Sequence, residues 1–126
     1  MSYIMDTHTL LWSMYRVEQL SDKVKDIIEN ADTLFVSKVS LWEIAVKQSL
    51  GKLEFTQSVV DIANECIRQD IQLLDIKAEH CEIIKTLPML HGDPFDRMII
   101  AQAIEKNLSI ITKDEKIPGY PVSCVW

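Results

Sequence analysis

The amino-acid sequence predicts an α/β fold, a three-layer sandwich in which helices flank a mainly parallel sheet. Short apolar runs typical of strands alternate with longer stretches whose apolar residues recur at helical spacing. The chain has 126 residues, of which 48% are hydrophobic, and this is enough for one domain with a real core. No Pro-, Gly- or Ser-rich linker divides it, so we expect a single domain over residues 1–126.

The N-terminal segment predicts a strand, two helices and a second strand. Residues 2–5 form a short strand that ends at Asp6, and residues 7–15 then carry apolar side chains at helical spacing. Ser21 is a favourable N-cap for a second helix with a clear amphipathic pattern. The compact apolar run 34–36 predicts the second strand.

The middle of the chain continues the alternation. A helix is expected to begin at Ser40 and to be closed by Gly51, because glycine accepts the left-handed conformation that follows many helices. Thr56 or Ser58 caps the next helix, which has one apolar stripe. Residues 71–74 predict a third strand.

The C-terminal part predicts two helices and two strands. A helix is expected over residues 77–86, before a proline. Asp93-Pro94 is a strong helix start, with Asp at the N-cap and Pro at the first helical position. This helix should run to about Lys106, and its segment 98–103 is apolar nearly all round, which predicts deep burial. The last strands are expected at 108–111 and 120–125.

Four carboxylates are expected near one edge of the sheet. Asp6 ends the first strand, Asp114 follows the strand 108–111, and Glu43 is expected in the first turn of the helix after the second strand. These positions belong to the carboxyl edge, where parallel α/β sheets hold their sites. Asp96 lies in the first turn of its helix, and its place at the edge follows less directly.

Such a cluster would have a definite chemistry. Like charges oppose one another's ionisation, and a divalent cation removes that penalty. Oxygen ligands without a His/Cys set favour Mg²⁺ or Mn²⁺ over Zn²⁺. A bound ion of this kind can activate water and stabilise the charge that builds on a phosphodiester. The pattern therefore indicates a phosphate-ester hydrolase.

Each acid also has a purely structural interpretation. Asp6 could be a turn residue or an N-cap, Glu43 could complete a capping box with Ser40, and Asp114 could be a solvated turn residue. Asp93 could be only an N-cap, and Asp96 would be favoured by the helix dipole whatever the function. Only their joint placement at one edge favours a site.

Composition limits the function classes. The net charge of −6 argues against a protein that grips duplex DNA through a broad basic face. No apolar run approaches the roughly 20 residues of a membrane-spanning helix, and the N-terminus lacks the pattern of a secretory signal. Three cysteines without a C-x-x-C spacing indicate free thiols. We therefore expect a cytoplasmic protein that does not bind membranes.

Four segments together resemble the PIN-domain family, and within it the VapC-like toxins of bacterial toxin–antitoxin pairs. They are IMDTHTLLW at 4–12, SKVSLWEIAVK at 37–47 with LGKL at 50–53, LPMLHGDPFDRMIIAQA at 87–103, and LSIITKD at 108–114. The resemblance covers essentially the whole chain in order. It implies a PIN-like fold with Asp6, Glu43, Asp96 and Asp114 as metal-binding, catalytic acids.

The resemblance leaves neighbouring residues with several interpretations. Asp93 could be a further metal ligand, an outer acid or only the helix cap. Thr7 and Thr112 lie beside ligands and could orient them or a water molecule. Arg97 could contact a scissile phosphate or form an exposed salt bridge. His91 is a further candidate for contact with substrate.

Similar proteins cleave RNA with Mg²⁺ or Mn²⁺, many of them as homodimers, and are inhibited by a cognate antitoxin protein. The resemblance therefore implies an RNA substrate, an antitoxin partner and a homodimer.

Two other functions are considered. A receiver-like signalling domain would use Asp75 as its phosphoacceptor near Thr112 and Lys113, and a PIN-like module could bind without catalysing. Trp12, Trp42 and Trp126 could stack on bases, and the first two could instead pack in the core or a dimer.

Overall fold

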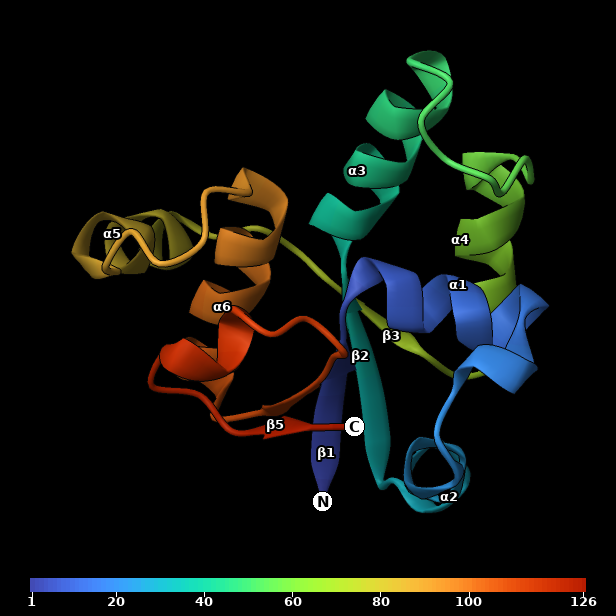
Figure 1. The fold of residues 1–126 in the computed structure, drawn as a ribbon, viewed down its shortest axis with the longest axis horizontal. Helices are drawn as coiled ribbons and strands as arrows, with labels where there is room; N and C mark the ends of the chain where they lie inside the picture. Colours follow the sequence, from blue (N-terminus) through green and yellow to red (C-terminus); the bar gives the residue numbers. More distant parts are fainter.

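In the computed structural model, which describes all residues 1–126, five parallel strands form one sheet. The strands are β1 (Ser2–Met5), β2 (Thr33–Ser37), β3 (Gln72–Leu74), β4 (Ser109–Ile111) and β5 (Cys124–Val125). Their order is β3-β2-β1-β4-β5, and every neighbouring pair is parallel (Figure 1). The predicted α/β class with a parallel sheet is confirmed.

Helices cover both faces of this sheet. They are α1 (Thr7–Tyr15), α2 (Asp22–Asn30), α3 (Lys38–Ser49), α4 (Val59–Arg68), α5 (Ala78–Thr86) and α6 (Pro94–Lys106), with 3₁₀ turns at Val17–Gln19 and Ile117–Gly119. In Figure 1, α5 and α6 lie on one side of the sheet and α1, α2 and α4 on the other. No helix has both the length and the apolar character needed to cross a bilayer.

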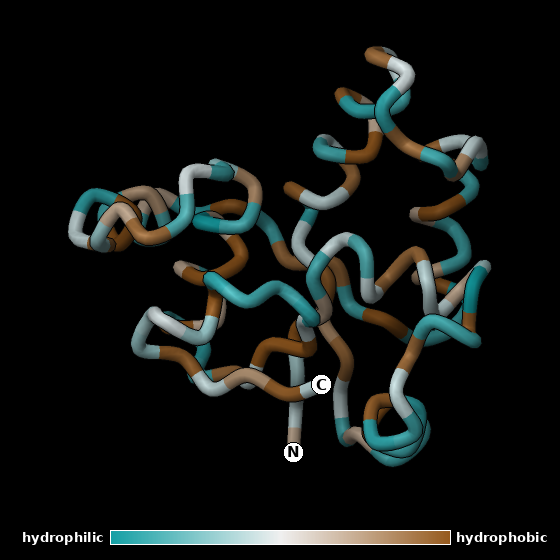
Figure 2. The backbone as a smooth tube through the Cα atoms, in the orientation of Figure 1, coloured by the Kyte–Doolittle hydropathy of each residue, from teal (hydrophilic) through white to brown (hydrophobic).

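The two faces of the sheet bury two separate cores. Ile4 and Ile110 belong to the core under α6, whereas their neighbours Met5 and Ile111 belong to the core under α1 and α4. This alternation follows from the two-residue period of a strand. A slip of one residue would exchange the two faces of a strand, so these side chains fix the register. Figure 2 shows the hydrophobic strands and the mostly hydrophilic α2, in which only Val24 is buried.

The ends of α3 and α6 follow the predicted chemistry. Asp93 caps α6, Pro94 is its first residue, and Asn107 ends it in the left-handed conformation, with φ at 54°. After α3, Gly51 has a positive φ of 66°. The predicted burial of residues 98–103 is also confirmed, because every one of them is buried.

Two predicted boundaries are wrong. α3 begins at Lys38 rather than Ser40, because the hydroxyl of Ser37 accepts from the backbone N–H of Val39 (3.0 Å) and caps the helix there. Glu43 therefore lies in the second turn, and no capping box forms at Ser40. The last strand is only two residues long, because the chain before it turns: the backbone N–H of Val122 donates to the carbonyl of Tyr120 (2.7 Å), and Pro121 has no N–H to give to the ladder.

The strand order creates a crevice at the carboxyl edge. β2 and β4 flank β1 on opposite sides, so the chain connections reverse direction between β1 and β4. Open parallel sheets bind ligands at such a switch point. The backbone N–H of Asp6 donates to the carbonyl of Ile111 (3.2 Å), so the ends of β1 and β4 are joined where the crevice begins.

Candidate functional site

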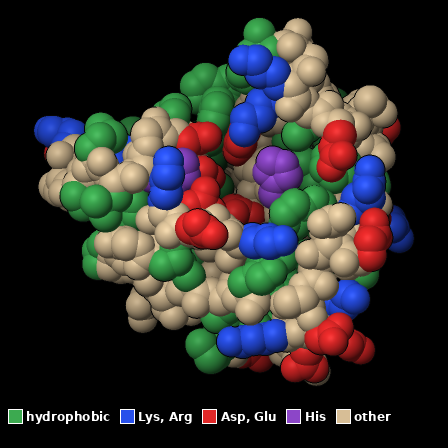
Figure 3. Space-filling view, in the orientation of Figure 1, with side chains coloured by type: hydrophobic (Ala, Val, Ile, Leu, Met, Phe, Trp, Pro, Cys, Tyr) green, Lys and Arg blue, Asp and Glu red, His purple; other side chains and the backbone are tan.

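A cleft of about 560 Å³ lies at this edge, and we call it the acidic cleft. Six carboxylates line it, contributed by Asp6, Glu43, Asp93, Asp96, Asp114 and Glu115. The rest of its wall is formed by Thr7, His8, Trp12, Lys47, His91 and Lys113. On the face shown in Figure 3, acidic, basic and histidine side chains gather around a hollow. The structure thus brings Asp6, Glu43, Asp96 and Asp114 together, although they come from four separate segments.

Asp6 has a structural role as well as a place in the acidic cleft. Its Oδ1 accepts from the backbone N–H of Thr9 (2.9 Å) and so caps α1, while its Oδ2 accepts from the hydroxyl of Thr112 (2.5 Å). Burial raises the pKa of Asp6, and the hydrogen bonds from Thr112 and Thr9 offset this only in part. A buried carboxylate of this kind gains from a nearby cation.

Glu43 enters the acidic cleft from the second turn of α3. Its side chain is buried, and its Oε1 accepts from the hydroxyl of Thr7 (2.5 Å). Its Oε2 forms an ion pair with Lys47, one helical turn further along. Burial acts to lower the pKa of Lys47, but the hydrogen bond and charge of Glu43 outweigh it and the pKa is raised. Lys47 is therefore a counter-charge of the cleft.

The start of α6 presents two acids. Asp93 Oδ1 accepts from the backbone N–H groups of Phe95 (2.8 Å) and Asp96 (3.2 Å), so the predicted cap is confirmed, and the residue also lines the acidic cleft. Burial raises the pKa of Asp96 to about 8, and repulsion from the surrounding carboxylates adds to the effect. Those carboxylates belong to Asp93, Glu43, Asp6 and Asp114. The acidic cleft thus has an excess of negative charge.

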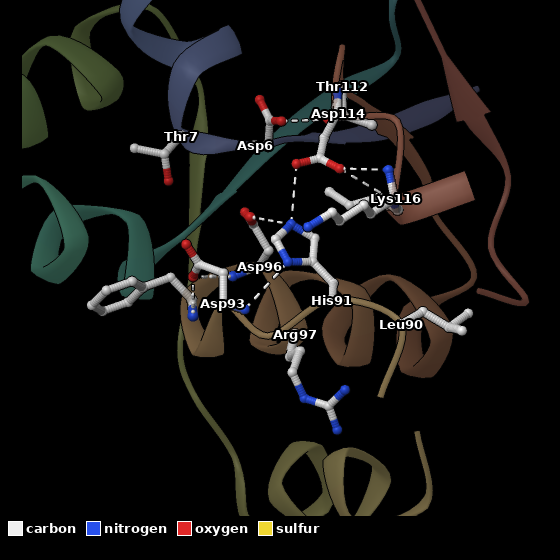
Figure 4. A network of polar contacts seen from close by, with 12 residues as sticks. Asp6, Thr7, Leu90, His91, Asp93, Asp96, Arg97, Thr112, Asp114 and Lys116 are labelled. Atoms are coloured by element: carbon white, nitrogen blue, oxygen red, sulfur yellow. Dashed lines mark hydrogen bonds and ion pairs between the residues drawn. The ribbon is translucent and has the colours of Figure 1, made fainter. Parts of the chain in front are cut away.

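His91 bridges two of the acids (Figure 4). Its Nε2 lies 3.0 Å from Asp96 Oδ2 and 3.1 Å from Asp114 Oδ2. Its Nδ1 accepts from the backbone N–H of Asp93 (3.2 Å), so in the neutral ring the hydrogen is on Nε2 and is directed at the carboxylates. Burial would raise the pKa of Asp114, but hydrogen bonds from the Lys116 backbone and His91 outweigh it and lower that pKa.

The two threonines lie where they can hold carboxylates in place. Thr112 Oγ1 donates to Asp6 and accepts from the backbone N–H of Asp114 (3.0 Å), so it ties the ends of β1 and β4 together. Thr7 Oγ1 makes the corresponding contact with Glu43 on the opposite wall. Each hydroxyl fixes the rotamer of one acid that lines the cleft.

Arg97 does not enter the acidic cleft, and both interpretations offered for it are wrong. Its side chain is buried and points away from the carboxylates (Figure 4). It donates to the carbonyls of Pro88 (2.9 Å) and Ile84 (3.2 Å) and to the hydroxyl of Tyr120 (3.1 Å). One position along a helix turns a side chain by about 100°, so Arg97 faces the C-terminal end of α5 while Asp96 faces the cleft.

The donor set fits a hard divalent cation. Asp6, Glu43, Asp96 and Asp114 offer only carboxylate oxygens, the ligands that Mg²⁺ and Mn²⁺ prefer. His91 lies with Asp96 and Asp114 in a group whose ligand atoms are within 4.8 Å of one another. Because its Nδ1 accepts a backbone hydrogen bond, Nε2 has no free lone pair for a metal. The arrangement therefore favours an oxygen-only site.

Comparison with known proteins identifies the family. The model of the PIN domain matches residues 3–122, nearly the whole chain. The chain belongs to the PIN domain family. This PIN domain is also 27% identical over 128 residues to "Ribonuclease VapC22" of Mycobacterium tuberculosis, and the match covers 98% of this chain and 97% of that protein. The resemblance to VapC-like proteins is confirmed.

Solved structures show the same fold. The VapBC2 structure from Rickettsia felis, bound to a DNA fragment from its promoter, matches with a TM-score of 0.72 at 16% identity over 99% of this chain and 98% of that one. FitAcB from Neisseria gonorrhoeae matches with a TM-score of 0.63 at 18% identity over 100% of this chain and 97% of that one. At such identities the likeness shows the fold alone.

The alternative of a receiver-like domain is wrong. β3 is an edge strand, so Asp75 at its end lies two strands away from β1. Asp75 is exposed and forms an ion pair with Lys38 outside the acidic cleft of this PIN domain. Asp75 would lie next to Asp6 only in a sheet that has β3 beside β1.

Two contacts among the residues of the cleft were not predicted. Lys47 was not paired with Glu43, although a lysine four residues after a glutamate on a helix is a readable signal. The bridging position of His91 has no such signal, because the loop that carries it has no regular period.

Proposed function

We propose that this PIN domain is an endoribonuclease that depends on a divalent cation, Mg²⁺ or Mn²⁺, held by Asp6, Glu43, Asp96 and Asp114. The observation that carries the proposal is the convergence of these carboxylates on one cleft, where mutual repulsion contributes to an Asp96 pKa of about 8. Such a cluster is unfavourable unless a cation neutralises it. The relative named as a ribonuclease supports the choice of reaction.

The residues of the acidic cleft have different roles in the proposed reaction. When bound, the cation lowers the pKa of water and stabilises negative charge on a phosphodiester. Thr7 and Thr112 hold Glu43 and Asp6 in fixed rotamers by hydrogen bonds. Lys47 and Lys113 line the walls, where their charges attract the phosphates that flank the bond to be cut. Asp93 caps α6 with one oxygen and can serve as a further ligand with the other.

The relatives support a proposal for the biological setting. One solved neighbour is a toxin–antitoxin complex from Klebsiella pneumoniae, and another is a DNA-bound VapBC from Salmonella typhimurium. We infer that this chain is the toxin of such a pair, acts on RNA in the cytoplasm as a homodimer, and is inhibited by an antitoxin protein. The negative cleft favours an antitoxin segment that presents a basic side chain to it.

The test is cleavage of structured RNAs, single-stranded RNA and DNA, with Mg²⁺, Mn²⁺ or EDTA. We expect the wild type to cut RNA only with a divalent cation, and Asp6→Asn to lower the rate more than about 100-fold. Asp75→Asn is the matched control, because it removes an exposed acid outside the acidic cleft. Absence of cutting by the folded wild type on every RNA would replace this proposal with a PIN-like binding module.

A further inference from the structure

We propose that one wall of the acidic cleft, formed by the rings of His8 and Trp12 and here called the aromatic wall, binds a nucleobase of single-stranded RNA. The inference rests on the proposed ribonuclease function and names how its substrate is held. Every base has a π-face, so stacking on such a wall accepts many sequences.

The aromatic wall lies beside the carboxylates on the same helix. His8 and Trp12 are four residues apart on α1, and their ring centroids are 5.4 Å apart with planes tilted by 53°. Both side chains line the acidic cleft, and Trp12 is the one hydrophobic residue among the twelve that do. A planar ring that enters the cleft can therefore stack on the indole of Trp12, whereas the other ring in the lining outside this wall, that of His91, is engaged by Asp96 and Asp114.

The indole of Trp12 is held in place by its neighbours. Trp126 packs edge-on against it, with centroids 5.7 Å apart and planes at 65°. Trp12 also packs against the core under α1 and is only half-buried. A ring fixed in this way loses little conformational entropy when a base stacks on it. His8 is exposed, so a purely structural role in the core does not explain its position.

The spacing from the carboxylates suits a nucleotide. α1 begins at its cap Asp6, and the six residues from Asp6 to Trp12 correspond to a rise of about 9 Å. A phosphate at the carboxylates and a base on the aromatic wall would both be positioned by this one helix. Lys47 and Lys113 line the same cleft and offer positive charge to the phosphates on either side. An apolar peptide side chain would use the wall but not these two charges.

Trp42 provides a matched control. It is 61% exposed and packs edge-on against Phe95, with centroids 5.2 Å apart, but it does not line the acidic cleft. A variant of this residue removes a tryptophan from the surface without touching the aromatic wall.

The experiment measures binding, so it is independent of cleavage. Full-length Asp6→Asn protein, which we expect to cut more than about 100-fold more slowly than the wild type, is titrated in Mg²⁺ with fluorescent oligoadenylate and with a fully abasic ribose-phosphate chain of equal length. We expect Trp12→Leu to weaken oligoadenylate binding about 5- to 150-fold and to leave abasic binding unchanged. Trp12→Phe should retain most of the affinity, and Trp42→Leu should match the parent.

The outcomes separate the two proposals. Equal weakening for both chains, or none for either, would overturn the aromatic wall even if the wild type cuts RNA. If Trp12→Leu weakens only oligoadenylate binding but the wild type cuts no RNA, the aromatic wall is upheld and the nuclease proposal is rejected. Because Trp12→Leu also removes packing against Trp126, a thermal melt accompanies it. If that variant unfolds, His8→Ala replaces it. His8 is exposed, and its removal should also weaken oligoadenylate binding selectively, by a smaller factor.

Discussion

Individual acids of this PIN domain serve two purposes at once. Asp6 and Asp93 each cap a helix with Oδ1 and line the acidic cleft. The backbone N–H groups at the two helix starts compensate part of the cost of burying these carboxylates. Asp96 has no comparable compensation, because its principal neighbours are other acids and one histidine. Its protonation is therefore sensitive to the loss of any neighbouring charge.

Asp96→Asn should stabilise the protein without metal. The folded-state pKa of Asp96, about 8, lies above its ordinary value of 3.8, so the folded state holds this proton more tightly than the unfolded state. The stability that the protonated Asp96 side chain contributes is fully present below about pH 4 and is lost as pH rises towards 8. In EDTA the wild-type Tm should therefore fall over that range more than the variant's. A gain of 1 kcal/mol at pH 8 corresponds to about 3–5 °C.

Thermal melts of both proteins at several pH values measure this difference. Parallel curves for wild type and variant would contradict the excess of negative charge in the acidic cleft. Asp75→Asn is a suitable comparison, because the hydrogen bond and charge of Lys38 lower the pKa of that exposed acid. Its loss should not flatten the pH profile.

At the scale of elements, the buried guanidinium group of Arg97 holds the loop between α5 and α6 in place. Arg97 donates to carbonyls at the end of α5 and to Tyr120, whose hydroxyl also accepts from the backbone N–H of His91 (2.8 Å). The loop that carries His91 is thus linked to α6 through the hydroxyl of Tyr120. The position of the bridging imidazole depends on a side chain that never enters the cleft.

Arg97→Ala should destabilise the fold by about 2–4 kcal/mol, because it removes a buried side chain together with its hydrogen bonds to Pro88, Ile84 and the buried hydroxyl of Tyr120. Urea denaturation measures this value. Arg68→Ala is the matched control, since Arg68 is largely exposed and pairs only with Glu65 within its own helix. An equally small effect of both changes would show that Arg97 is dispensable to the loop.

Sequence reasoning succeeded where local chemistry decides the structure. Asp93-Pro94 and Asn107 define both ends of α6 because a cap, a fixed φ and a left-handed residue act within a few positions. It failed for the start of α3, because Ser37 serves both as the last residue of β2 and as the cap of that helix. It also failed for Arg97, because helical spacing identifies a buried position but not the distant carbonyls that accept its hydrogens.

For the molecule as a whole, the acidic cleft makes stability depend on cations. A ligand that binds only the folded state stabilises it by about 2.7 kcal/mol at 100 times its Kd, which corresponds to a Tm increase of about 10 °C. We expect Mn²⁺ or Mg²⁺ to raise the wild-type Tm in this way, Asp75→Asn to keep the response, and Asp6→Asn to lose most of it. Differential scanning fluorimetry with a metal titration measures the shift. An unchanged response in Asp6→Asn would remove that residue from the ligand set.

The hydrogen bond between Thr112 and Asp6 joins positions 106 residues apart, close to the two ends of the sequence. During synthesis at about 5–20 residues per second, roughly 5–20 s separate the emergence of one partner from that of the other. Until then the nascent chain contains the first acid but not the last. If all four acids are needed for the proposed cleavage, a chain whose synthesis stops before Asp114 cannot cut RNA, so the activity begins only when nearly the whole chain has been made.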